Sequence, residues 1–146
     1  MNLLETLSGV YTSSTVGIPE GERVKVTRVV LAEDHPKVRA GIRTLLEKAS
    51  DIEIVGEAGD GEEALRLIDE YSPDVLLLDV EMPLMNGIEV ARRLKEEGSP
   101  VRILVLSAYH DRQYVHRMME SGAAGYLTKE EAPEKIVRAV RGIAQD

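Results

Sequence analysis

The sequence contains no cysteine, no tryptophan and no phenylalanine. Without cysteine there is no thiol nucleophile, no thiolate ligand for zinc or an iron–sulfur cluster, and no disulfide. No apolar run approaches the roughly 20 residues of a membrane-spanning helix, and the N-terminus lacks the basic start and apolar core of a signal peptide. We therefore expect a soluble, cytoplasmic protein that does not associate with membranes.

Positive charge is also scarce. The chain has 18 Lys and Arg against 26 Asp and Glu, which gives a net charge of −8. This charge repels phosphate backbones and anionic lipids, so we expect no direct DNA binding by this chain. Its 146 residues, 43% hydrophobic and 30% charged, are enough for one globular domain.

Two regions differ in composition. Residues 1–24 are rich in Ser and Thr and carry an isolated cluster of Leu3, Leu4 and Leu7. We interpret this region as a flexible N-terminal extension, with a short partner-docking helix as the alternative. Residues 25–146 are expected to form the folded domain.

From Thr27 onward, short apolar runs alternate with stretches of helical spacing. The apolar runs are Thr27–Ala32, Ile52–Gly56, Val75–Leu78, Val101–Leu106 and Gly125–Leu127. Apolar residues recur at helical spacing within residues 38–49, 64–71, 88–94, 115–119 and 136–143. The alternation predicts an α/β fold with a doubly wound, five-stranded parallel sheet. Continuously apolar runs predict three central strands, whereas the alternation of Ile52-Glu53-Ile54 predicts an edge strand.

Polar side chains follow four of the five predicted strands. They are Glu33 and Asp34, Asp79, Ser107, and Thr128 with Lys129. Because the carboxyl ends of parallel strands meet at one edge of a sheet, we expect these side chains to converge. Three carboxylates gathered without a cation resist ionisation, and oxygen ligands favour a hard ion. The sequence therefore predicts a Mg²⁺ site.

Asp79 ends the most apolar run, ahead of a turn that contains Met82-Pro83 and Asn86-Gly87. A carboxylate held there can act as a nucleophile toward phosphorus. Lys129 and Mg²⁺ would neutralise the transferring phosphoryl group, and Ser107 would donate a hydrogen bond to it.

Each of these residues also has a structural interpretation. Asp34 can be the N-cap of a helix that begins at Pro36, and Asp79 can cap a turn. The histidines are interpreted as surface residues rather than metal ligands; they are His35, His110 and His116.

Four dispersed motifs resemble those of the receiver domain of bacterial two-component response regulators. They are Glu33-Asp34, Leu78-Asp79 with Met82-Pro83 and Asn86-Gly87, Leu106-Ser107-Ala108, and Tyr126-Leu127-Thr128-Lys129. The resemblance covers Thr27 to about Gln145. Finer features are similar to the NarL/FixJ subfamily, whose members usually carry a LuxR-type output domain; these features are Glu33-Asp34-His35-Pro36, Val38-Arg39-Ala40-Gly41 and Gly56-Glu57-Ala58.

The resemblance implies a flavodoxin-like fold with strand order 2-1-3-4-5 and a function in signalling rather than metabolism. Asp79 would accept a phosphoryl group from a sensor histidine kinase, and transcription would be regulated through an output domain absent from this chain. Implied Mg²⁺ ligands are Asp34, Asp79, the Glu81 backbone carbonyl and, through a water, Glu33. Lys129 would pair with the phosphoryl group, Ser107 would be the switch hydroxyl, and Tyr126 would change rotamer.

The chain departs from many receivers at Ser107, where the switch hydroxyl is often Thr, and at Glu130, which follows Lys129 where proline in a cis bond is common. No cis proline is therefore expected there. The resemblance also implies a phosphorylation-dependent homodimer. The first and last helices, with Arg138 and Arg141, are favoured as its face over the side of the fourth helix.

Two alternatives remain at this point. A Mg²⁺-dependent phosphatase of the haloacid dehalogenase type would also use an Asp nucleophile, but that family has a second Asp where this chain has Glu81, and it needs a cap. A pseudo-receiver would act as a scaffold without phosphate.

Overall fold

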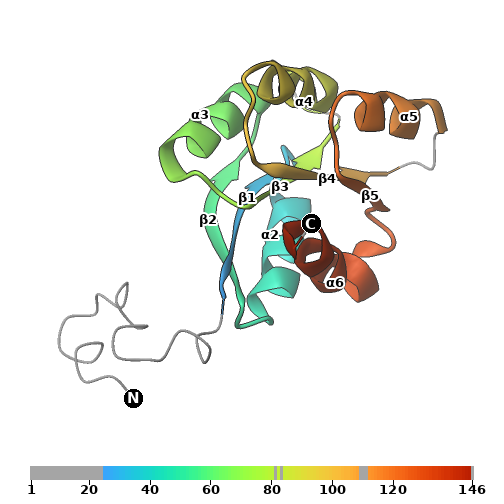
Figure 1. Cartoon of the computed structure of the whole chain (residues 1–146). Helices are drawn as coiled ribbons and strands as arrows, with labels where there is room; N and C mark the ends of the chain where they lie inside the picture. The colour runs from blue at the N-terminus through green and yellow to red at the C-terminus, as the bar shows by residue number, and fades with distance from the viewer. Residues whose placement is uncertain (1–24, 81, 83, 109–111, 146) are drawn as a thin grey trace.

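The computed structural model describes residues 25–80, 82, 84–108 and 112–145. Its strands form one parallel sheet in the order β2-β1-β3-β4-β5, which confirms the predicted architecture. The strands are β1 (Thr27–Ala32), β2 (Ile52–Ala58), β3 (Val75–Asp79), β4 (Arg102–Ser107) and β5 (Gly125–Thr128). The helices are α2 (Pro36–Glu47), α3 (Gly61–Tyr71), α4 (Gly87–Glu96), α5 (Arg112–Glu120) and α6 (Ala132–Gln145). Helices α2 and α6 cover one face of the sheet, and α3, α4 and α5 cover the other (Figure 1).

The central strands are apolar on both faces because helices cover both. In β3, Leu76 and Leu78 pack into the cluster under α3, α4 and α5, whereas Val75 and Leu77 pack into the cluster under α2 and α6. All four residues are fully buried. At the sheet edge, Glu53 of β2 is exposed, as its alternating pattern predicts.

Three strands extend past the ends of the apolar runs predicted from the sequence, because each includes the polar residue that follows its run. Strand β3 includes Asp79, β4 includes Ser107, and β5 includes Thr128. Strand pairing continues through these residues, with Asp79 opposite Leu106 and Ser107 opposite Thr128. The polar residues are therefore held by the sheet itself and not by loops.

Helix ends follow local capping chemistry. Gly98 and Gly122, which adopt φ values of +70° and +108°, follow α4 and α5, where glycine tolerates a positive φ at a helix C-terminus. The N-cap of α2 is His35, whose Nδ1 accepts a hydrogen bond from Val38 N at 3.4 Å. The structural interpretation of Asp34 as this cap is therefore wrong.

Within the described ranges, no helix combines the length and apolar character needed to cross a bilayer.

Candidate functional site

Three carboxylates meet at the carboxyl edge of the sheet. Glu33 and Asp34 directly follow β1, and Asp79 is the last residue of the neighbouring strand β3. One oxygen from each lies within 4.8 Å of the others. The Glu33 and Asp79 side chains are only 1% and 5% exposed, while Asp34 is exposed. The cluster thus combines two buried carboxylates with one that faces solvent.

Lys129 brings a positive charge to this cluster from the end of β5. Its Nζ lies 2.7 Å from Glu33 Oε1 and 3.4 Å from Asp79 Oδ2. Burial alone lowers the pKa of Lys129, but the Glu33 and Asp79 carboxylates outweigh burial and raise that pKa above its ordinary value. Lys129 is therefore charged at neutral pH and bridges the two buried carboxylates.

The donor set fits a hard divalent cation. Glu33 Oε1 is buried and receives no hydrogen bond within the described part of the chain, although Lys129 pairs with it electrostatically. One ammonium does not balance three carboxylates, and all the available donors are oxygens. This chemistry suits Mg²⁺. The predicted fourth ligand, the Glu81 carbonyl, lies outside the described residues.

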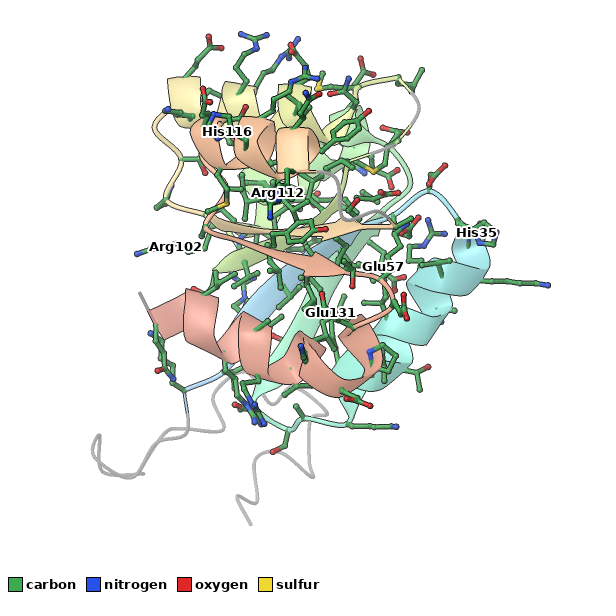
Figure 2. The ribbon with its side chains drawn as sticks, turned by 90° about the vertical axis from the view of Figure 1, so that its right-hand side faces the viewer. His35, Glu57, Arg102, Arg112, His116 and Glu131 are labelled. Atoms are coloured by element: carbon green, nitrogen blue, oxygen red, sulfur yellow. The ribbon has the colours of Figure 1, made fainter. Side chains whose placement is uncertain are left out.

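Ser107 and Tyr126, the predicted switch residues, lie on the neighbouring strands β4 and β5. Ser107 is 3% exposed, and its carbonyl accepts a hydrogen bond from Lys129 N at 2.8 Å. Tyr126 is half-buried and lines a pocket between α5 and β5 with Arg112 and His116, among others. Figure 2 shows these last two residues on the α5 side of the sheet. The Lys129 backbone is thus tied directly to the residue that carries the predicted switch hydroxyl.

Arg39, on α2, is a neighbour of the site that the sequence pattern does not indicate. It donates a hydrogen bond to the Glu33 carbonyl at 2.8 Å, and its Nε lies 3.5 Å from Glu57 Oε1. Arg43 pairs with the same Glu57 carboxylate at 3.0 Å. Figure 2 shows Glu57 near the start of α2, marked there by His35. These contacts fix the backbone at Glu33. An arginine on a helix surface has no sequence pattern that would predict such a role.

Gly87 is a second residue whose role is visible only in three dimensions. A Cβ at this position would lie 2.7 Å from Val80 Cα and 2.8 Å from the Asp79 carbonyl oxygen. Gly87 N also donates to the Val80 carbonyl at 3.0 Å. The start of α4 therefore rests directly against the backbone that carries Asp79.

Thr128 and Glu131 form a third unpredicted feature beside Lys129. Glu131 Oε1 accepts hydrogen bonds from Thr128 Oγ1 at 2.8 Å and from Thr128 N at 3.1 Å. Hydrogen bonds from Thr128, followed by one from Lys135, lower the pKa of Glu131 to about 2. The T-x-x-E spacing is a capping-type signal that sequence reasoning can detect.

Comparison with known proteins gives one consistent result. The sequence model of the response regulator receiver domain matches residues 29–141. The transcriptional regulatory protein DegU of Brevibacillus brevis is 38% identical over 81% of this chain and 50% of its own length. LiaR of Bacillus subtilis is 42% identical over 81% of this chain and 56% of its own. The chain thus spans about half the length of these curated relatives.

Solved structures agree with the sequence comparisons. The receiver domain of the response regulator NarL from Mycobacterium tuberculosis superposes with a TM-score of 0.80 at 40% identity, covering 83% of this chain and 98% of that one. A LuxR-family response regulator from Aurantimonas gives a TM-score of 0.79 at 35% identity, over 83% of this chain and 86% of that chain.

Proposed function

The chain belongs to the response regulator receiver domain family, in its NarL/LuxR-type branch, and we propose that it is a switch in which Asp79 accepts a phosphoryl group from a sensor histidine kinase. The observation that carries this proposal is the convergence of Glu33, Asp34, Asp79 and Lys129 at one edge of the sheet. Asp79 alone combines burial, contact with Lys129 and a backbone held inside a strand.

Each of these residues has a separate role in the proposed phosphoryl transfer. An Asp79 carboxylate oxygen attacks the phosphorus in line, a P–O bond forms, and the bond from phosphorus to the kinase histidine nitrogen breaks. Lys129 offsets the charge that builds on the phosphoryl oxygens. Asp34 and Asp79 would hold Mg²⁺ directly and Glu33 through a water, with the Glu81 carbonyl as a further ligand. The bound ion would supply additional charge neutralisation at the same oxygens.

The new phosphoryl group would then shift a two-state surface. Ser107 ends β4, one residue beyond Leu106, the partner of Asp79 in the sheet, and in this proposal its hydroxyl donates a hydrogen bond to a phosphoryl oxygen. We propose that Ser107 and Lys129 shift toward the phosphoryl group. This shift would change the rotamer of Tyr126 and the surface around it. A charge-assisted contact made only in the phosphorylated state is what biases such an equilibrium.

The rest of the proposal concerns the longer protein. Residues 25–146 would be the receiver unit and residues 1–24 an extension of it. A LuxR-type output domain would bind DNA and regulate transcription in the cytoplasm, while the acidic receiver itself would not bind DNA. A phosphatase is not favoured, because the relatives are transcriptional regulators. Retention of the acceptor, the acidic pair, the hydroxyl and the lysine speaks against a pseudo-receiver.

The test is phosphorylation by acetyl phosphate with and without Mg²⁺, followed by intact-mass spectrometry. We expect one Mg²⁺-dependent phosphoryl addition that Asp79→Asn abolishes. Asp69→Asn, an exposed α3 variant with the same change of chemistry, is expected to behave like the wild type. Phosphorylation of Asp79→Asn at the wild-type level would refute the assignment.

A further inference from the structure

Lys129 lies in a tight turn between β5 and α6. Glu131 N donates a hydrogen bond to the Thr128 carbonyl at 3.1 Å, which closes a four-residue turn with Lys129 at its second position. Glu130, which follows Lys129, is exposed and has no ring to restrict the backbone. Apart from this bond and the one from Lys129 N to the Ser107 carbonyl, further restraint on the path of the turn must therefore come from side chains.

Side chains of Thr128 and Glu131 supply that restraint through reciprocal hydrogen bonds. The Glu131 carboxylate accepts from both Thr128 N and Thr128 Oγ1, and Thr128 Oγ1 accepts from Glu131 N at 3.2 Å. Thr128 is 3% exposed and paired with Ser107 in the sheet. We call this set of contacts the Thr128–Glu131 lock; it joins the two ends of the turn that carries Lys129.

The lock is also fixed to α6. Glu131 Oε2 accepts from Lys135 Nζ, one helical turn further on, at 3.0 Å. Figure 2 shows Glu131 on the α6 side of the sheet. One carboxylate therefore connects the last residue of β5 with the first turn of α6, and Lys129 lies between these two anchored points.

We propose that the Thr128–Glu131 lock is the positioning device that aims the Lys129 ammonium at Glu33 and Asp79. Lysine has a long, flexible side chain, so the location of its charge depends on how firmly its backbone is held. Lys129 Nζ reaches both carboxylates, at 2.7 and 3.4 Å, from a turn held at both ends. This inference rests on one part of the proposed function, namely that Lys129 acts on the phosphoryl group.

The test compares variants that break the lock with variants that keep it. Glu131→Ala removes the shared acceptor, and Thr128→Val removes the hydroxyl while keeping the shape and the β-branch. Thr128→Ser restores the hydroxyl. Glu134→Ala is the matched control, because it removes one negative charge from the first turn of α6, three residues after Glu131. Circular dichroism establishes that each variant is folded at the temperature of the assay.

Two readouts are used on the whole chain. The first is the NMR signal of the Lys129 side chain, without any phosphodonor. We expect Glu131→Ala and Thr128→Val to move it toward the position of an exposed lysine, and Thr128→Ser and Glu134→Ala to leave it unchanged. The second is the initial rate of phosphorylation by acetyl phosphate in saturating Mg²⁺, which should fall about tenfold in the first two variants only.

A double-variant comparison separates positioning from general damage. In a Lys129→Ala background, adding Glu131→Ala should lower the rate no further, because the lock acts through the missing ammonium. An equal additional loss in that background would overturn the proposal, as would an unchanged Lys129 signal in Glu131→Ala. If Lys129→Ala alone reacts at the wild-type rate, the catalytic part of the proposed function fails, and the NMR signal still decides the positioning.

Discussion

At the scale of single residues, Glu33 and Asp34 are neighbours in sequence with different surroundings. Glu33 is 1% exposed, lies against Lys129, and accepts a hydrogen bond from His35 N at 3.2 Å. Asp34 is exposed at the mouth of the same cluster. The exposed carboxylate of Asp34 suits direct coordination, whereas Glu33 is already held by protein groups.

This difference predicts unequal effects on Mg²⁺ binding. Asp34→Ala should weaken Mg²⁺ binding about 100-fold and Glu33→Ala about tenfold, because a direct ligand is lost in the first case and a water-mediated contact in the second. Titration calorimetry is the suitable measurement, since the chain has no tryptophan for fluorescence. Equal losses in the two variants would contradict this division of roles.

Glu131 predicts an acid-side dependence of stability. Its pKa is about 2 in the folded protein, against an ordinary value of 4.5, so the carboxylate favours folding above pH 4.5. This contribution is lost as the pH falls from 4.5 toward 2. Urea unfolding at a series of pH values should show a stability gap between wild type and Glu131→Gln that is constant above 4.5 and narrows below it. A gap that stays constant down to pH 2 would rule this out.

At the scale of elements, the sequence pattern predicts the sheet well because burial dictates it. Strands covered on both faces are expected to be continuously apolar, and β1, β3 and β4 contain such runs, at Val29–Leu31, Val75–Leu78 and Ile103–Leu106. Polar residues follow those runs, so the edge of the sheet that the sequence predicts coincides with the candidate site. Close approaches in three dimensions leave no such pattern, and for that reason the roles of Arg39 and Gly87 could not be predicted.

Gly87 gives a direct test of the packing between α4 and β3. A methyl group there meets backbone atoms at 2.7 and 2.8 Å, so α4 or Asp79 must shift. Gly87→Ala should lower the free energy of unfolding by about 2 kcal/mol and slow phosphorylation. Gly142→Ala in α6 meets nothing within 4 Å and should be neutral or stabilising by up to about 1 kcal/mol. Chemical denaturation of both variants measures this, and equal stabilities would contradict it.

At the scale of the whole molecule, α2 and α6 lie side by side and present one continuous face (Figure 1). Arg141 of α6 forms a two-pronged ion pair with Asp51, at 2.7 and 2.8 Å, which joins α6 to the segment between α2 and β2. Through the Thr128–Glu131 lock, the same α6 is connected to Lys129. A shift of Lys129 at the proposed phosphoryl site would therefore be passed through the Thr128–Glu131 lock to α6 and to this face.

We accordingly expect phosphorylation to drive dimerisation through α2 and α6. Sedimentation velocity should show a shift toward dimer when beryllofluoride, a phosphoryl mimic, is added with Mg²⁺. Arg138→Glu should suppress this dimer, because Arg138 is exposed on α6, whereas Arg66→Glu on α3 should not. Arg141 is a poorer probe, since Asp51 already engages it. A dimer that survives Arg138→Glu but not Arg66→Glu would place the interface on the opposite face.

Asp79 is the proposed acceptor of the phosphoryl group. An aspartyl phosphate is a mixed anhydride, and borohydride reduces it to the alcohol, which converts the aspartate to homoserine. After treatment with acetyl phosphate and Mg²⁺, peptide mass spectrometry should find homoserine at position 79 and aspartate still at position 34. Omission of Mg²⁺ should abolish the conversion. Homoserine at position 34 in place of 79, or no conversion at 79 under conditions that add a phosphoryl group to the chain, would contradict the account.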